Sequence, residues 1–521
     1  MGEHFGQVKR RGADVVAQAL ARAGTRHVFA LSGNHVMSVF DAALDAKLPL
    51  LHVRHEAAAV HMADAWARLT GDAGIALVTG GPGHANAVSA LYTALAAESP
   101  VVLLSGHAPL GEMGKSAFQE MAQAEIAAPV CKAAWTVRSA RTLGEDLARA
   151  IRMAKAGRPG PVHLSLPSDV LEAEVDAELP AEEAFLPESH HPSAEAIEEL
   201  LDILQKARKP LVIAGPALGN ARGRALLRQF EAVAHVPGIV MESPRGVNDP
   251  CLGLLTEVLA AADVVVLAGK RRDFTLRFGA AFAKECKVLE AESMTEHWIA
   301  QAGRKNWAKS GWLNEVRAAI AFRPGQWKDL ASKPGGPLHP VEVGREVQRL
   351  LDAPEAVLVA DGGEFGQWSQ ATLSAPHRVI NGPAGSIGAA LPFAAAAKLA
   401  LPGSNVVAML GDGTFGFHAS EIDTAVRYGL AFVAVVGNDA CWNAEYQIQL
   451  RSYGAARAHG LELLPARYDR VAAGFGAHGE HVERPAELAP ALARAARAGR
   501  AACVNVLIER LPAPVFRRQD A

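Results

Sequence analysis

The chain has 521 residues, of which 50% are apolar and 21% are charged, and its formal net charge is −3. A single hydrophobic core does not grow to this length, so the composition indicates a globular protein of about three domains. The sequence has no lysine- or arginine-rich block and no apolar stretch long enough to span a bilayer. We therefore expect neither a nucleic-acid partner nor a membrane.

Two features concern the compartment of the protein. Residues 1–11 lack the apolar stretch of a signal peptide. The five cysteines are scattered singly, without the CxxC pair of a metal site. Both features favour a reducing environment, and we expect a cytoplasmic protein.

The first part of the chain alternates predicted strands with alanine-rich helices, which is the pattern of a parallel sheet covered by helices. The predicted strands cover residues 26–31, 48–53, 101–105 and a segment within 159–168. Polar residues follow the first two strands, with Asn34 and His35 after one and Glu56 after the other. We predict an N-terminal domain over residues 1–175.

The middle of the chain begins after an acidic linker, residues 176–192, that contains three prolines. A predicted helix from Ser193 and two apolar strands, 210–215 and 263–268, indicate a central domain over residues 190–325. The second strand leads into segment 269–279, whose lysine and arginines can meet the phosphates of a nucleotide. A solvated charged surface is the simpler interpretation of the same residues.

The last part of the chain, residues 339–511, contains two apolar strands, 405–410 and 432–436, with a predicted helix, 419–427, between them. A strand, helix and strand in this order give two parallel strands. The residues that follow the strands then emerge at the same edge of the sheet, where α/β proteins bind ligands.

Two carboxylates stand at this edge. Asp412 follows the first strand between Gly411 and Gly413, which let the backbone approach a ligand closely. Asn438 and Asp439 follow the second strand, with Asn438 lying 27 residues after Gly411. Two hard oxygen donors together with phosphate oxygens are ligands that Mg²⁺ prefers. The sequence therefore predicts a pocket for a metal-bound diphosphate.

This spacing resembles the signature of the thiamine diphosphate-dependent enzymes, and the resemblance covers essentially the whole chain. It implies an α/β fold of three doubly wound parallel-sheet domains of the decarboxylase and synthase type. The family usually has asparagine where this chain has Asp439. By the resemblance, Asp412, Asp439 and the backbone carbonyl of Cys441 are expected to bind Mg²⁺.

The segment around Glu56 resembles the one that carries the catalytic glutamate in acetolactate synthase, benzaldehyde lyase and 2-hydroxyacyl-CoA lyase. In the family this glutamate hydrogen-bonds the aminopyrimidine ring, whose imino form then takes the proton from the thiazolium ring to give the nucleophilic ylide. Such a carboxyl group needs apolar surroundings that raise its pKa, and the alanines after Glu56 fit this need.

Further stretches resemble family segments in the same order. They are a glycine-rich turn beside the pyrimidine, with a helix expected from Ala87, a diphosphate loop after the strand 356–360, and a wedge within 382–392 that holds the cofactor bent. The residues thereby expected to contact thiamine diphosphate are Thr79, Pro82, Asn86, Gly363, Glu364, Gly385, Ile387, Gly411, Asp412, Gly413, Thr414, Asp439, Cys441 and Trp442.

The same resemblance suggests which residues address the substrate. His35 takes the place of a histidine in benzaldehyde lyase-like enzymes that moves protons, with Asn34 beside it. Gln119 takes the place of a glutamine that reaches the active centre. Trp442 and Ala444 match positions that shape the substrate pocket.

The resemblance implies an enzyme that cleaves or forms a C–C bond in 2-oxo acids, aldehydes or acyloins. The alternatives are a 2-hydroxyacyl-CoA lyase, a 2-oxo acid decarboxylase, and a catalytically silent nucleotide-binding homologue. Relatives bind FAD or ADP in the central domain, but segment 269–279 lacks the Arg-Phe-Asp-Asp motif of acetolactate synthases, which argues against FAD. Family members share the cofactor between subunits, so a dimer or tetramer is expected.

Overall fold

The computed structural model of the chain describes residues 9–188 and 192–517. Most of the N-terminal segment, part of the first linker and the last four residues therefore lie outside the described residues. The chain separates into two compact units, Met1–His190 and His191–Ala521, and the second unit contains two sheets. The boundary between a central and a last domain, inside this second unit, stays a prediction.

The first unit is built on a six-stranded sheet of order β3-β2-β4-β5-β7-β6, in which every pair of neighbours is parallel. Its strands are β2 (Val28–Ala30), β3 (Leu50–His52), β4 (Gly74–Val78), β5 (Val101–His107), β6 (Ala133–Thr136) and β7 (Val162–Pro167). A separate antiparallel pair joins β1 (Arg10–Arg11) and β8 (Glu174–Val175). The helices are α1 (Gly12–Arg22), α2 (Met37–Asp45), α3 (Glu56–Thr70), α4 (Pro82–Ala96), α5 (Gln123–Ala127), α6 (Leu143–Lys155) and α7 (Ser168–Glu172).

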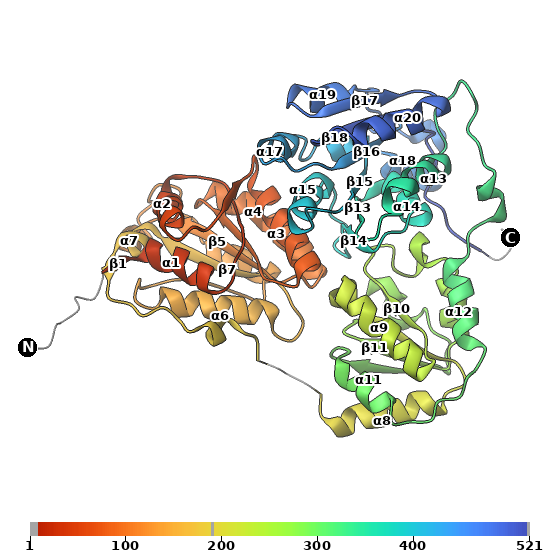
Figure 1. Cartoon of the computed structure of the whole chain (residues 1–521), viewed down its shortest axis with the longest axis horizontal. Coiled ribbons are helices and arrows are strands. Elements are labelled where there is room, and N and C mark those ends of the chain that lie inside the picture. The colour runs from red at the N-terminus through yellow and green to blue at the C-terminus, as the bar shows by residue number, and fades with distance from the viewer. Residues whose placement is uncertain (1–8, 189–191, 518–521) are drawn as a thin grey trace, which may run out of the picture. The chain divides into compact units, whose positions relative to one another are not determined.

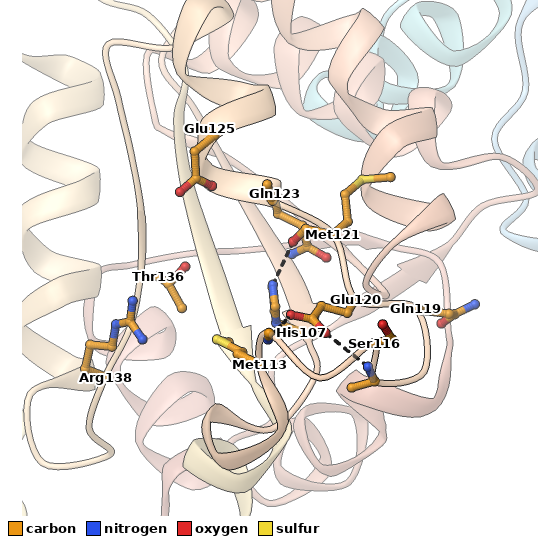
Figure 2. Close-up of a pocket in the computed structure, with 13 residues that line it drawn as sticks. His107, Met113, Ser116, Gln119, Glu120, Met121, Gln123, Glu125, Thr136 and Arg138 are labelled. Carbon is orange, nitrogen blue, oxygen red and sulfur yellow. Dashed lines mark hydrogen bonds between the residues drawn. The ribbon is translucent and has the colours of Figure 1, made fainter.

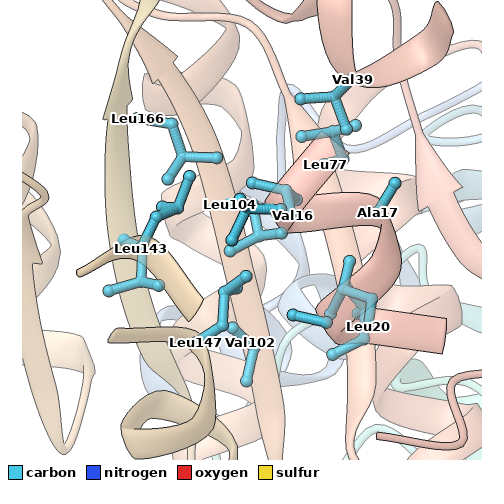
Figure 3. Packing of buried hydrophobic residues seen from close by; sticks show 14 of the residues in the cluster. Val16, Ala17, Leu20, Val39, Leu77, Val102, Leu104, Leu143, Leu147 and Leu166 are labelled. Atoms are coloured by element: carbon cyan, nitrogen blue, oxygen red, sulfur yellow. The ribbon is translucent and has the colours of Figure 1, made fainter. Parts of the chain in front are cut away.

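Helices cover both faces of this sheet because successive side chains of a strand point to opposite faces. Val102 and Leu104 of β5 are fully buried in one cluster with Leu20 of α1 and Leu147 of α6, and Figure 3 shows this packing. Leu103, between them, is equally buried but lies outside that cluster, and helices α3 and α4 also contact the strands. The sheet is therefore doubly wound, and its two faces are buried against different sets of helices.

The second unit contains a smaller parallel sheet of order β10-β9-β11-β12. Its strands are β9 (Pro210–Ala214), β10 (Gly238–Val240), β11 (Val264–Ala268) and β12 (Lys287–Ala291), and its helices are α8 (Ala194–Lys206), α9 (Ala221–Ala234), α10 (Leu255–Ala261), α11 (Glu296–Ala302) and α12 (Trp312–Ala321). The predicted helix from Ser193 is α8, and the Ser193 hydroxyl caps it by accepting the N–H of Ala196.

The remaining sheet has the order β14-β13-β15-β16-β18-β17 and is parallel throughout. Its strands are β13 (Val357–Ala360), β14 (His377–Ile380), β15 (Val406–Gly411), β16 (Val433–Asn438), β17 (His478–Val482) and β18 (Ala502–Leu507). Its helices are α13 (Pro340–Leu351), α14 (Gly363–Thr372), α15 (Ala390–Ala400), α16 (Asp412–Phe415), α17 (Glu421–Arg427), α18 (Asn443–Tyr453), α19 (Tyr468–Gly474) and α20 (Pro485–Ala496).

The two six-stranded sheets have the same strand order, and Figure 1 labels all the strands of the second one, β13 to β18. In each, the first strand lies between the second and the third, so the chain order reverses between β2 and β4 and between β13 and β15. Ligands bind outside the carboxyl ends of strands at such reversal points. The predicted α/β fold with doubly wound parallel sheets is confirmed.

One helix begins earlier than predicted. Helix α4 starts at Pro82, not at Ala87, because proline is favoured in the first helical turn, where its missing N–H costs nothing. Pro82 and Asn86 therefore stand on the helix, and the turn before it is formed by Gly80 and Gly81.

In the part of the chain that the structure describes, no helix is both long and apolar enough to cross a membrane.

Candidate active site

Asp412 and Asp439 stand at the ends of neighbouring parallel strands. Gly411, at the end of β15, pairs in register with Gly437 of β16. Asp412 is the next residue after Gly411 and begins the short helix α16, while Asp439 follows the last residue of β16. The register therefore brings two carboxylates to one edge of the sheet.

Both carboxyl groups are removed from water. Asp412 is 4% exposed, and burial raises its pKa to about 6. Burial, followed by the negative charge of Asp412, raises the pKa of Asp439 to about 7. The Oδ1 atom of Asp412 accepts the N–H of Gly413 at 2.9 Å, whereas its buried Oδ2 atom has no hydrogen-bond partner among the described residues. An oxygen of this kind lacks the compensation that buried charges ordinarily have.

These residues fit a divalent cation. Burial disfavours the charged forms of both carboxyl groups, and a cation beside them would stabilise those forms and give the Asp412 Oδ2 atom a partner. Within residues 9–188 and 192–517 there is no group of three His, Cys, Asp or Glu side chains suited to a metal. A cation here would thus need backbone and ligand oxygens besides the two carboxylates, as Mg²⁺ accepts.

Glycines let aromatic rings pack directly on the strand ends next to the carboxylates. A Cβ atom on Gly413 would lie 2.8 Å from the ring of Trp442, and one on Gly437 would lie 2.4 Å from the ring of Phe365. Gly413, Gly437 and both rings border a cavity of about 320 Å³ within the second unit. All predicted cofactor and pocket residues of this unit line it, namely Gly363, Glu364, Gly385, Ile387, Gly411, Asp412, Gly413, Thr414, Asp439, Cys441, Trp442 and Ala444.

The loop after β16 is fixed by contacts that the sequence analysis did not identify. Arg510 donates to the carbonyl of Asp439 at 3.1 Å and to the carbonyl of Ala440 at 3.3 Å. Asn438 donates from Nδ2 to the Asn505 side chain at 3.1 Å, and its Oδ1 atom accepts the N–H of Ala440 in the loop at 3.2 Å. Asn438 therefore shapes the loop from behind, while Asp439 remains beside the cavity.

The segment that carries Gly385 and Ile387 is held by Asp361, which was not among the predicted site residues. Asp361 is 1% exposed, and its carboxylate accepts the N–H groups of Gly388 at 2.9 Å and Ala390 at 3.2 Å. A Cβ atom on Gly362 would lie 2.6 Å from the Ile387 side chain. Close packing and a buried carboxylate thus fix the position of Ile387 at the cavity wall.

Glu364 is engaged by two separate segments of the second unit. Its Oε2 atom accepts from Arg245 at 3.0 Å and from the backbone N–H of Ala513 at 2.8 Å. Nearby, Asn443 donates to the carbonyl of Leu511 at 2.9 Å. The C-terminal segment, through residue 517, is therefore docked beside the cavity, and Glu364 organises its wall rather than offering an unpaired carboxylate.

In the first unit, Glu56 is the first residue of α3. Asn86, one turn into α4, donates from Nδ2 to Glu56 Oε2 at 3.0 Å. Gly83 allows α4 to approach, since a Cβ atom there would lie 3.3 Å from Glu56 Oε1. Two predicted residues from different helices are thus brought into contact.

His35 and Thr79 meet at the point where the strand order of this sheet reverses. His35 follows β2 in a short 3₁₀ helix, Asn34–Val36, and its Nδ1 atom lies 3.2 Å from the hydroxyl of Thr79, just after β4. Burial lowers the pKa of His35 below its ordinary value. The side chain is 5% exposed, whereas the neighbouring Asn34 is exposed.

Gln119 lies on the loop between β5 and β6, in a left-handed conformation with φ of +57°. Its carbonyl oxygen would lie 2.6 Å from a Cβ atom on Gly81, so the loop packs directly on the turn that precedes α4. Gln119 also lines a second cavity, of about 630 Å³, which Figure 2 shows. His107, Gln123 and Arg138 line the same cavity.

The residues around Glu56 in the first unit and those around Asp412 in the second unit both lie in segments that match known proteins. Residues 10–126 match the family described as thiamine pyrophosphate enzyme, N-terminal TPP binding domain. Residues 361–506 match its C-terminal TPP binding domain. The acetolactate synthase large subunit of Mycobacterium tuberculosis is 32% identical over 97% of this chain and 97% of its own length. The chain belongs to the thiamine pyrophosphate enzyme family.

The predicted membership of the thiamine diphosphate-dependent family, whose cofactor is also called thiamine pyrophosphate, is confirmed. Other relatives within it carry a different name. The 2-hydroxyacyl-CoA lyase 2 of Homo sapiens is 30% identical, and that of Mus musculus 31%, each over 96% of this chain and 90% of the relative. The chain is therefore an acetolactate synthase-like enzyme of this family. The N-terminal match contains the residues around Glu56, and the C-terminal match contains the residues around Asp412.

Proposed function

We propose that this enzyme uses thiamine diphosphate with Mg²⁺ to cleave or form the C–C bond next to a carbonyl group in 2-oxo acids, aldehydes or acyloins. The observation that carries the proposal is the pair Asp412, which is buried, and Asp439, which is partly buried, at neighbouring strand ends beside a glycine-lined cavity. When bound, the thiazolium ring supplies a nucleophilic carbon and an electron sink for C–C bond cleavage.

The residues of the second unit would hold the diphosphate end. Asp412, Asp439 and the carbonyl of Cys441 would bind Mg²⁺, and the backbone around Gly411, Gly413 and Thr414 would approach the phosphates. Ile387, fixed through the Asp361 carboxylate, would support the rings from the cavity wall.

The residues of the first unit would hold the pyrimidine end. Thr79, Pro82 and Asn86 would line it, and Glu56 would exchange a proton with the aminopyrimidine ring. Asn86 keeps one oxygen of Glu56 hydrogen-bonded and so fixes the direction of the carboxyl group. General acid–base catalysis depends on such positioning before it depends on pKa.

His35 is suited to move a proton at the substrate oxygen. Its lowered pKa keeps the ring neutral near pH 7, so it can accept a proton, and Thr79 fixes one ring nitrogen. Gln119 and Asn34 would contact the substrate from the adjoining loops, and Trp442 and Ala444 would limit its size.

A second candidate is a 2-hydroxyacyl-CoA lyase, which the relatives of that name support. Segment 269–279 favours it over an FAD-containing acetolactate synthase. Lys270 is 6% exposed and pairs with Asp273 at 2.8 Å, and Arg272 pairs with Glu290 at 3.2 Å. Lys270 is thus paired inside the protein, whereas the Arg272 pair is exposed to solvent, and the pairing of both cations argues against their use on the phosphates of FAD or ADP.

We further propose a homodimer or tetramer in the cytoplasm. The two clusters lie in separate units of one chain. A cofactor bound between the first unit of one subunit and the second unit of its partner would contact both the residues around Glu56 and those around Asp412. Sedimentation of the purified protein with and without cofactor checks the oligomeric state.

Product analysis distinguishes the candidate reactions. The protein loaded with thiamine diphosphate and Mg²⁺ is incubated with pyruvate, with another 2-oxo acid, with an acyloin and with a 2-hydroxyacyl-CoA. An acyloin product or its cleavage supports the first proposal, CO₂ with an aldehyde alone indicates a decarboxylase, and formyl-CoA with an aldehyde indicates the CoA lyase. If all products fail to form, while Glu56→Gln and the unchanged protein behave alike, the enzymatic proposal is wrong.

A further inference from the structure

A buried side-chain amide connects three strand ends of the first unit. Gln123, the first residue of α5, is 1% exposed. Its Oε1 atom accepts the N–H of Gly81 at 2.8 Å, and its Nε2 atom donates to the carbonyl of Gly106 at 3.1 Å and to the hydroxyl of Ser165 at 3.3 Å. Gly81 follows β4, Gly106 belongs to β5 and Ser165 belongs to β7. Gln123 also borders the second cavity (Figure 2).

The hydrogen bonds around Gln123 have a single consistent direction. His163 Nδ1 lies 3.1 Å from the carbonyl of Leu103, so it carries the proton, and His163 Nε2 must accept from Ser165 at 3.0 Å. Ser165 then accepts from the amide nitrogen of Gln123. A rotated amide would place NH₂ against the N–H of Gly81 and oxygen against the carbonyl of Gly106. The network therefore permits one orientation of Gln123, and linked bonds of this kind strengthen one another.

The bond to Gly81 holds an unusual turn. Gly81 has φ of +58° and ψ of −115°, and a Cβ atom there would lie 2.6 Å from the carbonyl of Gln119. The turn directly precedes α4, where Ala85 donates to the carbonyl of Gly81 at 2.9 Å. Asn86, in the same turn of α4, contacts Glu56. The position of the Gly81 peptide therefore sets where α4 begins and how Asn86 meets Glu56.

We propose that Gln123 is a positioning residue for the cofactor-activating glutamate, acting through Gly81, α4 and Asn86. Gln123 touches neither Glu56 nor, in the proposed function on which this inference rests, the cofactor. Its loss would let the Gly81 peptide rotate and would loosen the pyrimidine-binding turn. The effect would appear in cofactor affinity, since the turn must otherwise be ordered on binding.

Replacement of Gln123 by glutamate gives a test that depends on pH. In the Gln123→Glu variant, a protonated carboxyl group keeps two of the three hydrogen bonds of glutamine, with one oxygen accepting from Gly81 and the O–H donating to Gly106, and loses only the longer bond to Ser165. An ionised carboxylate sets a negative oxygen against that carbonyl. Burial raises the pKa of a carboxyl group at such a position, so the change between the two forms falls within an accessible range.

Other titratable groups near Gln123 give the background for this test. The groups are His84 of α4, His107 of β5, His163 of β7, Glu120 of the preceding loop and Glu125 of α5. Burial lowers the pKa of His84 to about 4 and that of His163 well below its ordinary range, so both stay neutral between about pH 5.5 and 8. Any effect of pH on cofactor binding through His107, Glu120 or Glu125 also occurs in the unchanged protein, which is therefore measured at each pH.

The experiment measures dissociation constants for thiamine diphosphate with saturating Mg²⁺ at about pH 5.5 and 8. Gln123→Glu should bind within about threefold of the unchanged protein at the lower pH and about tenfold or more weakly at the higher one. Gln123→Met, which keeps the shape and removes both bonds, should bind weakly at both values. Gln18→Glu, whose side chain accepts from Arg10 in the same unit, is the matched control and should bind normally throughout.

Hydrogen exchange of the cofactor-free protein gives an independent measurement. Segment 79–86 should exchange faster in Gln123→Met than in the unchanged protein or in Gln18→Glu. Normal affinity of both Gln123 variants at both pH values, or equal weakening of Gln123→Glu at both, overturns the inference while the proposed function stands. If the unchanged protein does not bind thiamine diphosphate, the proposed function fails, and unaltered exchange of segment 79–86 then overturns the positioning role separately.

Discussion

Burial and the negative charge of Asp412 together raise the pKa of Asp439 to about 7. Asp412 itself has a pKa raised to about 6 by burial. Between about pH 4 and 7 the folded, metal-free protein therefore binds more protons than the unfolded chain, whose aspartates titrate near 3.9. The contribution of Asp412 and Asp439 to the free energy of unfolding is therefore fully present below about pH 3.9 and is lost as the pH rises through 6 and 7.

Binding of a cation has the opposite pH dependence, because it requires both carboxyl groups to be deprotonated and so becomes stronger as the pH rises. We expect the apparent affinity for Mg²⁺, measured by titration in the presence of thiamine diphosphate, to rise roughly 30- to 100-fold between pH 5.5 and 8. The matched variant Asp439→Asn has the residue that the family usually carries at this position, and it should show a flatter dependence. Equal slopes for the variant and the unchanged protein would contradict the assignment of Asp439.

Glu56→Gln should abolish most turnover without loss of the cofactor. The amide keeps an oxygen for the hydrogen bond from Asn86 but cannot exchange a proton, so the rate should fall by about 10² to 10⁴. Binding of thiamine diphosphate, followed by calorimetry, should change by less than about tenfold. Glu112→Gln, at an exposed carboxyl of the same unit, is the control and should leave the rate unaltered.

Gly413→Ala should weaken cofactor binding by a steric route. The added Cβ atom would lie 2.8 Å from the Trp442 ring, and displacing a packed ring typically costs about 1–3 kcal/mol. We expect a lower melting temperature and weaker binding of thiamine diphosphate. Gly403→Ala, where nothing lies within 4 Å of the added atom, should behave normally. A normal Gly413→Ala protein would mean that the ring moves at little cost.

The C-terminal segment should detach when its aromatic anchor is removed. Phe516 is 8% exposed and its ring lies 5.4 Å from Trp327 and 6.2 Å from Phe322. Phe516→Ala should expose Arg510 to trypsin, because burial of a phenylalanine contributes about 3–5 kcal/mol and the segment can open locally. Val515→Ala, at a position 58% exposed, should not change the cleavage rate. Equal cleavage of the two variants would show that the hydrogen bonds of Ala513 and Leu511 hold the segment alone.

The paired carboxylates could be predicted because each follows a continuous apolar run of the form expected for a buried strand. Once two such strands are joined by a helix, their parallel arrangement brings the following residues to one edge, and Asp412 and Asp439 confirm that reasoning. Strands β10 and β12 were not predicted, because neither has such an apolar run. The first has only three residues, and the second, Lys287–Ala291, is only partly buried, so neither shows a long apolar run.

The supporting residues could not be predicted, since their partners lie far away in the sequence. Arg510 reaches a loop 70 and 71 residues earlier, and Arg245 reaches Glu364 across 119 positions. Gln123 gave a partial signal. Ser105, His107, His163 and Ser165 are polar residues at alternate positions of β5 and β7, which places them on one face of the sheet. Buried polar groups on such a face require partners, and from that requirement the hydrogen-bond network around Gln123 could have been expected.

The central claim is that Asp412 and Asp439 form a metal-dependent site for thiamine diphosphate. The most direct measurement is calorimetric titration of the chelator-treated protein with thiamine diphosphate, with and without Mg²⁺. We expect saturable binding with Mg²⁺ and binding at least about tenfold weaker without it. Asp412→Asn should lose this difference. Binding that ignores Mg²⁺, or no binding under either condition, would contradict the account.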